Sequence, residues 1–274
     1  MKLPATQPKP AAVTQWIFLR GLVRESGHWG AFVPFFECQV PGARVHALDL
    51  PGNGALYTHT SPMNLKAMVE SCRQQLRSAG LAPPYAVLAL SMGAMVAVQW
   101  AHDYPQELER QVLVNTSMRP YSAFYERLRP RNWATVADLL LRTLLRRASG
   151  RQWEAAVLRM TTTGHHPQTL QAWLLLRMAH PVSVANALRQ LWAAARFKAP
   201  ARRPQVPTLL LASSCDGLVS VRCSRVLAHV WQVPLVEHPR AGHDLALDDP
   251  QWLVQQICQS TVTVGSHRAA SLGP

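Results

Sequence analysis

The sequence predicts an α/β fold: a mostly parallel sheet with helices on both faces, interrupted by a helical insertion. Short runs that are apolar throughout alternate with helical patterns, and strands of this composition are typical of parallel sheets covered on both sides. The alternation stops between residues 118 and 205, where only helical patterns follow one another. A length of 274 residues suits one large domain that carries such an insertion.

Six segments have the composition of buried strands, because each is a short apolar run bounded by turn residues. They are Thr14–Gly21, Ala43–Gly54 with its Pro-Gly turn, Pro84–Ser91, Leu108–Ser117, Val206–Gly217 and Val233–His243. Helical spacing predicts the helices that lie between and after them, which are His28–Glu37, Asn64–Ala79, Met92–Tyr104, Ser220–Trp231 and Pro250–Thr261. Residues 1–117 and 206–274 therefore form the predicted core.

Residues 118–205 form the predicted insertion and hold nearly all of the net charge. They contain 15 Arg or Lys and three acidic residues, while the whole chain has a formal net charge of +13. Amphipathic helices are predicted over Asn132–Arg147 and Gln168–His180. Five leucines are expected to pack the insertion onto the core: Leu139, Leu140, Leu141, Leu144 and Leu145. Four tryptophans are core residues or candidates for lining an acyl pocket: Trp133, Trp153, Trp173 and Trp192.

Composition excludes several classes of protein. No apolar stretch reaches the roughly 18–20 residues that span a bilayer, so a transmembrane protein is not predicted. The N-terminal residues lack the apolar region of a secretory signal. The five cysteines are odd in number and lack CxxC spacing, which argues against a disulfide framework or a zinc site and favours the cytoplasm. The pair His165-His166 has no carboxylate near it in sequence and is expected to lie in a loop, so no metal site is predicted.

Ser91 follows the third predicted strand, in Ala89-Leu90-Ser91-Met92-Gly93. This pentapeptide is a variant of G-x-S-x-G, the turn that lifts a nucleophilic serine from the end of a strand. The turn is sharp, so the residues two before and two after the serine must be small. Alanine in place of the first glycine is sterically reasonable. A serine at this point can also be a simple turn or helix-capping residue.

Two later strand ends favour the nucleophile over the capping residue. Asp216 follows the fifth predicted strand and His243 follows the sixth. Open parallel sheets bind ligands beyond the carboxyl ends of their strands, where these three side chains meet. A serine needs a base to take its proton. His243 can do this while Asp216 fixes the histidine tautomer and stabilises the imidazolium. The sequence thus predicts a catalytic triad of Ser91, Asp216 and His243.

The loop after the first strand supplies the remaining element of the predicted site. It begins at Arg20-Gly21-Leu22. The backbone N–H groups of Leu22 and Met92 are expected to face the oxyanion that develops on an attacked carbonyl.

These motifs carry a resemblance to the α/β-hydrolase superfamily. The residues concerned are Leu19-Arg20-Gly21, His28-Trp29, Asp49-Leu50-Pro51-Gly52-Asn53-Gly54, Ser91-Met92-Gly93, Asp216 and Gly242-His243. The chain is most similar to the cap-bearing serine carboxylesterases that use no cofactor, including the pimeloyl-ACP methyl ester carboxylesterases. The resemblance covers roughly residues 16–257. It implies an α/β-hydrolase fold with a shortened sheet, the triad and oxyanion hole named above, and a cap formed by residues 118–205. Where the family often has His-Gly, this chain has Arg20-Gly21.

The leading functional hypothesis is therefore a serine hydrolase that cleaves a carboxylic ester through an acyl-enzyme. A thioesterase, or an esterase whose substrate is linked to an acyl carrier, is one alternative. A lyase or a non-catalytic binding protein on the same fold is another. A serine nucleophile argues against dehalogenase and epoxide-hydrolase chemistry, which in this fold needs a carboxylate.

The basic insertion permits two interpretations. It can be a solvated arginine-rich surface, as most charge runs are. It can instead bind an anionic partner, such as an acidic acyl carrier protein, a CoA ester or a negatively charged membrane surface. The candidates for this contact are Arg142, Arg146 and Arg147. Nucleic acid is not expected, because the basic residues share their helices with Leu and Trp stripes and no nucleic-acid motif is present.

Overall fold

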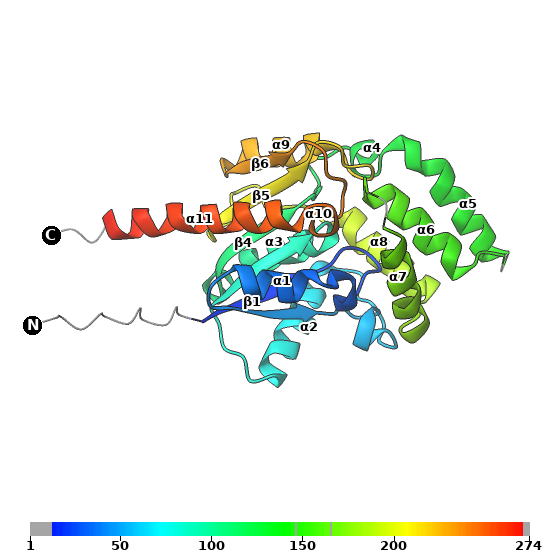
Figure 1. The fold of residues 1–274 in the computed structure, drawn as a ribbon, viewed down its shortest axis with the longest axis horizontal. Helices are drawn as coiled ribbons and strands as arrows, with labels where there is room; N and C mark the ends of the chain where they lie inside the picture. Colours follow the sequence, from blue (N-terminus) through cyan, green and yellow to red (C-terminus); the bar gives the residue numbers. More distant parts are fainter. Residues whose placement is uncertain (1–12, 146, 165, 271–274) are drawn as a thin grey trace, which may run out of the picture.

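The computed structural model, which describes residues 13–145, 147–164 and 166–270, contains a six-stranded sheet with the order β2-β1-β3-β4-β5-β6 (Figure 1). Every neighbouring pair of these strands is parallel. The bounds are β1 Thr14–Leu19, β2 Ala43–Leu48, β3 Tyr85–Leu90, β4 Leu108–Val114, β5 Thr208–Ser213 and β6 Leu235–His238. The six predicted strands and the predicted parallel arrangement are confirmed.

The sheet separates two apolar clusters, because successive side chains of a strand point to opposite faces. In β1, Ile17 and Leu19 join one cluster, whereas Trp16 and Phe18 join the other. The first cluster packs under α2 Leu65–Ser78, α3 Met92–Asp103 and α9 Val221–Trp231. The second packs under α1 Phe32–Gln39, α10 Leu245–Asp248 and α11 Pro250–Ala270. Burial on both faces explains why the strands read as continuous apolar runs.

Two predicted helices differ from the observed ones. The predicted helix His28–Glu37 consists of a short 3-10 helix, η1 Ser26–Trp29, followed by α1. Gly30 separates them with a φ of 51°, a left-handed conformation that a helix cannot continue. Helix α11 continues to Ala270, beyond the predicted end at Thr261. Two further 3-10 turns, η2 Gly54–Leu56 and η3 Pro105–Glu107, lie in loops.

The chain between β4 and β5 is helical and projects from the carboxyl ends of the strands (Figure 1). It contains α4 Phe124–Arg127, η4 Pro130–Asn132, α5 Trp133–Leu144, α6 Gly150–Thr161, α7 Pro167–Ala179 and α8 Val184–Arg196. We call residues 118–205 the helical insertion. Figure 1 shows it at the end of the molecule opposite the start of β1 and the end of α11.

The expected packing of the α5 leucines onto the core is mostly wrong. Leu139 is buried, but Leu140, Leu141 and Leu145 are exposed. The side chain of Leu144 lies outside the described residues. Apolar residues of α5 do gather on one side of the helix, but that side faces the solvent rather than the sheet. Of the four tryptophans, Trp173 is buried, Trp153 is half-buried, and Trp133 and Trp192 are largely exposed.

In the described part of the chain, we find no helix that is both long enough and apolar enough to cross a membrane. All five cysteines are free thiols. Cys38 and Cys215 are exposed, whereas Cys72 and Cys223 are buried. Burial raises the pKa of Cys72 to about 12 and that of Cys223 to about 11. Since the thiolate is the reactive form, both buried thiols are protected at neutral pH.

We therefore predict that two of the five thiols react rapidly with Ellman's reagent in the folded protein. Replacing Cys38 and Cys215 by Ser should remove this rapid phase, and denaturant should release Cys72 and Cys223. Cys258 is half-buried, and burial raises its pKa, so it should react more slowly than the exposed thiols. A rapid phase that survives in the Cys38→Ser/Cys215→Ser variant would contradict this protection of Cys72, Cys223 and Cys258.

Candidate active site

Ser91 occupies a strained turn between β3 and α3. Its φ of 57° and ψ of −116° lie outside the regions that residues with a side chain normally adopt. Such strain costs about 1–3 kcal/mol and persists only where surrounding structure enforces it. Here the Ser91 N–H donates to the carbonyl oxygen of Val114 at 2.9 Å, and Thr116 Oγ1 donates to the Ser91 carbonyl at 3.1 Å. The end of β4 therefore fixes the turn.

The absence of a side chain at Gly93 allows the turn to lie against β1. A Cβ at position 93 would come within 2.6 Å of the carbonyl oxygens of Leu19 and Arg20. Gly21 is also close, because a Cβ there would approach the Ser91 Cβ to 3.2 Å. Ala89, the residue two before the serine, is completely buried. The steric demand for small residues on both sides of Ser91 is thus met.

Asp216 and His243 are joined directly by the structure. The His243 Nδ1 and Asp216 Oδ2 atoms lie 2.7 Å apart, and both side chains are buried. The other carboxylate oxygen of Asp216 accepts hydrogen bonds from the N–H groups of Leu218 and Val219 at 2.7 and 2.9 Å. These bonds hold the carboxylate in one orientation, so the histidine presents Nε2 away from it. This arrangement selects the tautomer that a general base requires.

Asn115, which the sequence analysis did not single out, connects this pair to the serine turn. Its Nδ2 donates to the carbonyl of His243 at 2.8 Å, and its Oδ1 accepts from the N–H of Ser213 at 2.7 Å. Asn115 is buried and has a φ of 47°, a left-handed conformation that asparagine tolerates. It follows directly after β4, next to the residues that hold Ser91. The polar residues Asn115-Thr116-Ser117, directly after an apolar strand, could have indicated from the sequence that this strand end belongs to the site.

In the described residues, Ser91 Oγ makes no hydrogen bond to His243. Both lie at the carboxyl edge of the sheet and are anchored to consecutive residues after β4. The bond between a nucleophile and its base is often formed only when substrate is present.

The loop between β1 and η1 carries Leu22, the predicted oxyanion donor. The Arg24 N–H donates to the Gly21 carbonyl at 3.2 Å and closes this loop into a turn beside Ser91. Leu22 is half-buried. Met92, the second predicted donor, is the first residue of α3, where a backbone N–H has no acceptor within the helix. Val23 is strained at a φ of 52°, and Gln190 Oε1 of α8 accepts its N–H at 2.9 Å.

Buried ion pairs secure the same loop. Arg20 donates to Asp244 through both terminal guanidinium nitrogens, at 3.1 and 2.5 Å, directly beside His243. The residue that departs from the family's usual His-Gly thus contacts the histidine loop. Arg24 donates to Glu154 of α6 at 2.6 Å and stacks on the ring of Trp173 in α7. The helical insertion and the loop are therefore tied together.

His28 lies within this charged cluster and remains neutral. Burial, followed by the nearby guanidinium groups of Arg24 and Arg20, holds the pKa of His28 far below its usual range. Burial also lowers the pKa of Arg24 from its ordinary value, although the carboxylate of Glu154 opposes this effect. The neutral His28 ring lies 2.8 Å from Arg24 Nη1 and contacts Trp173.

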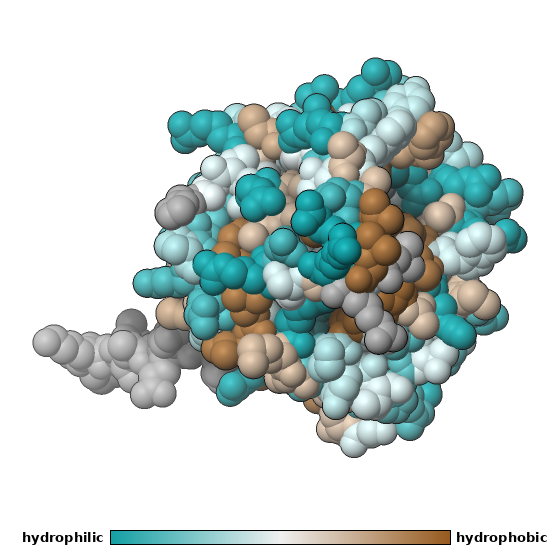
Figure 2. All heavy atoms as spheres, turned by 90° about the vertical axis from the view of Figure 1, so that its right-hand side faces the viewer, coloured by the Kyte–Doolittle hydropathy of each residue, from teal (hydrophilic) through white to brown (hydrophobic). Residues whose placement is uncertain are grey.

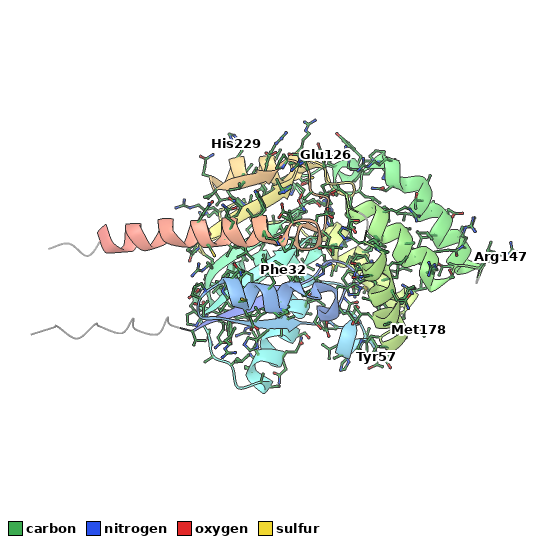
Figure 3. The ribbon with its side chains drawn as sticks, in the orientation of Figure 1. Phe32, Tyr57, Glu126, Arg147, Met178 and His229 are labelled. Carbon is green, nitrogen blue, oxygen red and sulfur yellow. The ribbon has the colours of Figure 1, made fainter. Side chains whose placement is uncertain are left out.

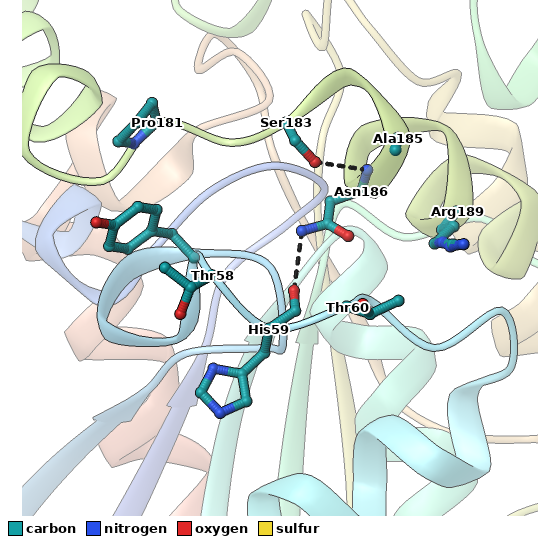
Figure 4. Close-up of a pocket in the computed structure, with 9 residues that line it drawn as sticks. Thr58, His59, Thr60, Pro181, Ser183, Ala185, Asn186 and Arg189 are labelled. Atoms are coloured by element: carbon teal, nitrogen blue, oxygen red, sulfur yellow. Dashed lines mark hydrogen bonds between the residues drawn. The ribbon is translucent and has the colours of Figure 1, made fainter.

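A polar groove of about 450 Å³ lies between the helical insertion and the loop after β2 (Figure 4). It is formed by the loop from Tyr57 to Thr60 and by residues at the start of α8. Asn186 Nδ2 donates to the His59 carbonyl at 2.9 Å across it. Ser91, Asp216 and His243 do not line this groove.

The three predicted contact arginines lie at the outer end of the insertion. Arg142 is exposed and pairs with Asp138 one turn earlier on α5. Arg147 is exposed, and Figure 3 places it at the outer tip of the molecule. Arg146 lies outside the described residues. His165 also lies outside them, while His166 Nε2 is 3.1 Å from Asp248 Oδ1, a carboxylate remote in sequence.

A parallel sheet with a serine in a strained strand–helix turn and an Asp–His pair at later strand ends is the architecture of an α/β-hydrolase. Residues 16–256 match the sequence model of the alpha/beta hydrolase family, and the chain belongs to that family of hydrolases.

Several known proteins are similar over nearly their whole length. A protein of Shigella flexneri described as "Putative carbamate hydrolase RutD" is 26% identical over 99% of this chain and 100% of its own. Two solved structures share the fold. A thermophilic esterase from Thermogutta terrifontis is 20% identical, with a TM-score of 0.71 over 92% of this chain and 91% of its own. A hydrolase from Pseudomonas aeruginosa is 21% identical, with a TM-score of 0.72 over 91% and 90%.

We predict that Gly93→Ala disrupts the serine turn. The new methyl group meets backbone oxygens that cannot rotate away, and overpacking of this kind costs about 1–3 kcal/mol. Urea unfolding should show this loss of stability, together with reduced hydrolytic activity.

Gly80→Ala is the matched control. Gly80 differs from the helical Gly93 in having a φ of 71°, but a Cβ there meets nothing within 4 Å. Its cost should be limited to backbone strain, and activity should be retained. Equal activity in the Gly93 and Gly80 variants would contradict the close approach of α3 to β1.

Proposed function

We propose that this chain is a serine hydrolase that cleaves a carboxylic ester of a small molecule through an acyl-enzyme. Ser91 is the nucleophile, His243 the general base and Asp216 the residue that orients it. The backbone N–H groups of Leu22 and Met92 form the oxyanion hole. The observation that carries the proposal is the 2.7 Å hydrogen bond between two buried side chains, Asp216 and His243, at the edge of the sheet where Ser91 is held in its strained turn.

The reaction follows from these positions. Ser91 Oγ attacks the ester carbonyl as His243 Nε2 takes its proton, and the imidazolium is stabilised by Asp216. The oxyanion is held by main-chain N–H groups that are already fixed in place. His243 then gives the proton to the departing alcohol, which leaves the acyl group on Ser91. A water molecule, deprotonated by His243, attacks the acyl-enzyme and releases the carboxylic acid.

The helical insertion acts as a cap over this site in the proposal. Gln190, Glu154 and Trp173 of the insertion contact the loop that carries the Leu22 donor. The cap thereby supports the oxyanion loop in addition to covering the substrate.

The same residues can act on other acyl groups. A thioester differs only in its leaving group, and the name of the RutD relative points to a carbamate. A carrier-linked ester is a further alternative, and a lyase would use the same serine and histidine without incorporating water. A panel of esters, thioesters and carbamates separates these substrates, and oxygen from labelled water appears in the product only of the hydrolases.

Ser91→Ala is predicted to abolish turnover of short p-nitrophenyl esters and labelling by a fluorophosphonate probe. Loss of a triad nucleophile typically costs on the order of 10⁴–10⁶ in kcat. Ser214→Ala is the control, because Ser214 is an exposed serine bonded to Glu237. That variant should keep both activities. Hydrolysis that persists in Ser91→Ala would refute the assignment of the nucleophile.

Asp216→Asn is predicted to lower kcat by roughly 10⁴-fold, because an amide favours the wrong histidine tautomer. KM for a short ester should change little. Glu237→Gln removes a half-buried carboxylate that pairs with Arg225 and serves as the control. A wild-type kcat in Asp216→Asn would mean that the hydrogen bond to His243 has no catalytic role.

A further inference from the structure

Helix α5 turns its apolar side outwards. The residues concerned are Trp133, Leu140, Leu141 and Leu145, the last of which is the C-cap of α5, and they are between 41% and 56% exposed. Their spacing of seven, one and four residues places them on one side of the helix. We call these four residues the α5 stripe. An amphipathic surface helix normally buries its apolar stripe against the core. Figure 2, which views the insertion end-on, shows apolar side chains gathered on this end of the molecule among hydrophilic ones.

The opposite side of α5 explains this orientation. It packs on α6 through the buried Leu139 and through a hydrogen bond from Trp153 Nε1 to Thr143 Oγ1 at 2.8 Å. Thr143 Oγ1 in turn donates to the Leu139 carbonyl. The side of α5 that carries Leu139 and Thr143 thus makes the contact with α6. The α5 stripe is left on the molecular surface, where it can contact a binding partner. Exposed apolar patches of this kind mark interaction sites.

An arginine-lined groove borders the α5 stripe. It lies between α5 and α6 and holds about 430 Å³. Its lining combines Arg142, Arg151 and Arg159 with polar residues and with the apolar Leu139, Ala155 and Ala156. Asp138 is the acidic residue in its lining, and it is engaged by Arg142 at 2.7 Å. The groove therefore keeps a net positive charge. Guanidinium groups in this arrangement suit phosphate oxygens, which they bind through paired hydrogen bonds.

We propose that the α5–α6 face docks onto the surface of an anionic phospholipid bilayer. The α5 stripe enters the boundary between headgroups and acyl chains, and the arginine groove takes the lipid phosphates. Apolar and aromatic side chains on one side with arginines beside them are the composition of helices that lie in a membrane interface. The face is at the outer edge of the molecule, with Arg147 at its tip, so a flat surface can reach it (Figure 3). This inference does not depend on the proposed ester hydrolysis.

The charge and shape of the face favour a membrane over the other occupants. A second copy of the chain would bring two strongly basic insertions together, and their repulsion opposes dimerisation through this face. An acidic acyl carrier protein would satisfy the arginines, but it would need a matching groove for the projecting α5 stripe. A lipid layer accommodates such side chains without a preformed groove.

Vesicle co-sedimentation of the full-length Ser91→Ala variant tests the proposal without lipid hydrolysis. The vesicles consist of phosphatidylcholine, with or without phosphatidylglycerol. We expect binding to the anionic vesicles that weakens with salt. Leu141→Gln/Leu145→Gln should lower the partition coefficient at least tenfold. Arg151→Gln/Arg159→Gln should lower it by about 25-fold, since each arginine near such a surface contributes about fivefold.

Two double variants outside the helical insertion serve as matched controls. Val226→Gln/Val230→Gln changes exposed valines of α9, and Arg44→Gln/Arg77→Gln removes two exposed charges. Both should bind like the parent. Circular dichroism and thermal unfolding show whether each variant is folded. Because the substituted side chains are exposed, the variants should melt near the parent temperature.

Other results would overturn the proposal. Equal partitioning of the Leu141→Gln/Leu145→Gln variant and its parent would show that the α5 stripe does not contact the membrane. Binding that is independent of phosphatidylglycerol would show that the arginine-lined groove does not recognise anionic lipid. If sedimentation velocity showed a dimer that this variant abolishes, the face would be a subunit interface. If acyl carrier protein bound where vesicles did not, the partner would be a protein.

Discussion

The site depends on the close approach of α3 to the end of β1. With no side chain at Gly93, the carbonyl oxygens of Leu19 and Arg20 can lie where a Cβ would otherwise be. This contact permits the sharp turn in which Ser91 has its strained positive φ. It also places the loop after β1 beside the serine. Because every strand is parallel, β5 and β6 deliver Asp216 and His243 to the same edge.

The core of the fold was predictable because its signals are local. The central strands β3 and β5 are buried on both faces, so they consist mainly of apolar residues. Ser91, Asp216 and His243 each follow a predicted strand, and parallel topology is enough to place all three at one edge. The division of the first predicted helix was harder to foresee, since it depends on the conformation of the single residue Gly30.

The supporting shell of the site was not predictable, because its contacts join distant parts of the chain. Asn115 reaches His243, Glu154 reaches Arg24, and Gln190 reaches Val23 across 167 positions. Polar residues within helices give no local indication of such partners. The predicted packing of the α5 leucines onto the core was wrong for a different reason. Periodicity identifies which residues share a face, but it does not say whether that face meets the protein or its surroundings.

Helix α8 has a consequence for how the chain folds. It buries Asn186 and Gln190 against the loops after β1 and β2, while Leu188 and Trp192 face outwards. The apolar residues that it does bury, Ala193 among them, belong to the same cluster as the sheet. The described residues of the helical insertion therefore lack a substantial apolar interior of their own. Such packing is typical of a part that depends on the sheet for its structure rather than of a domain with its own core.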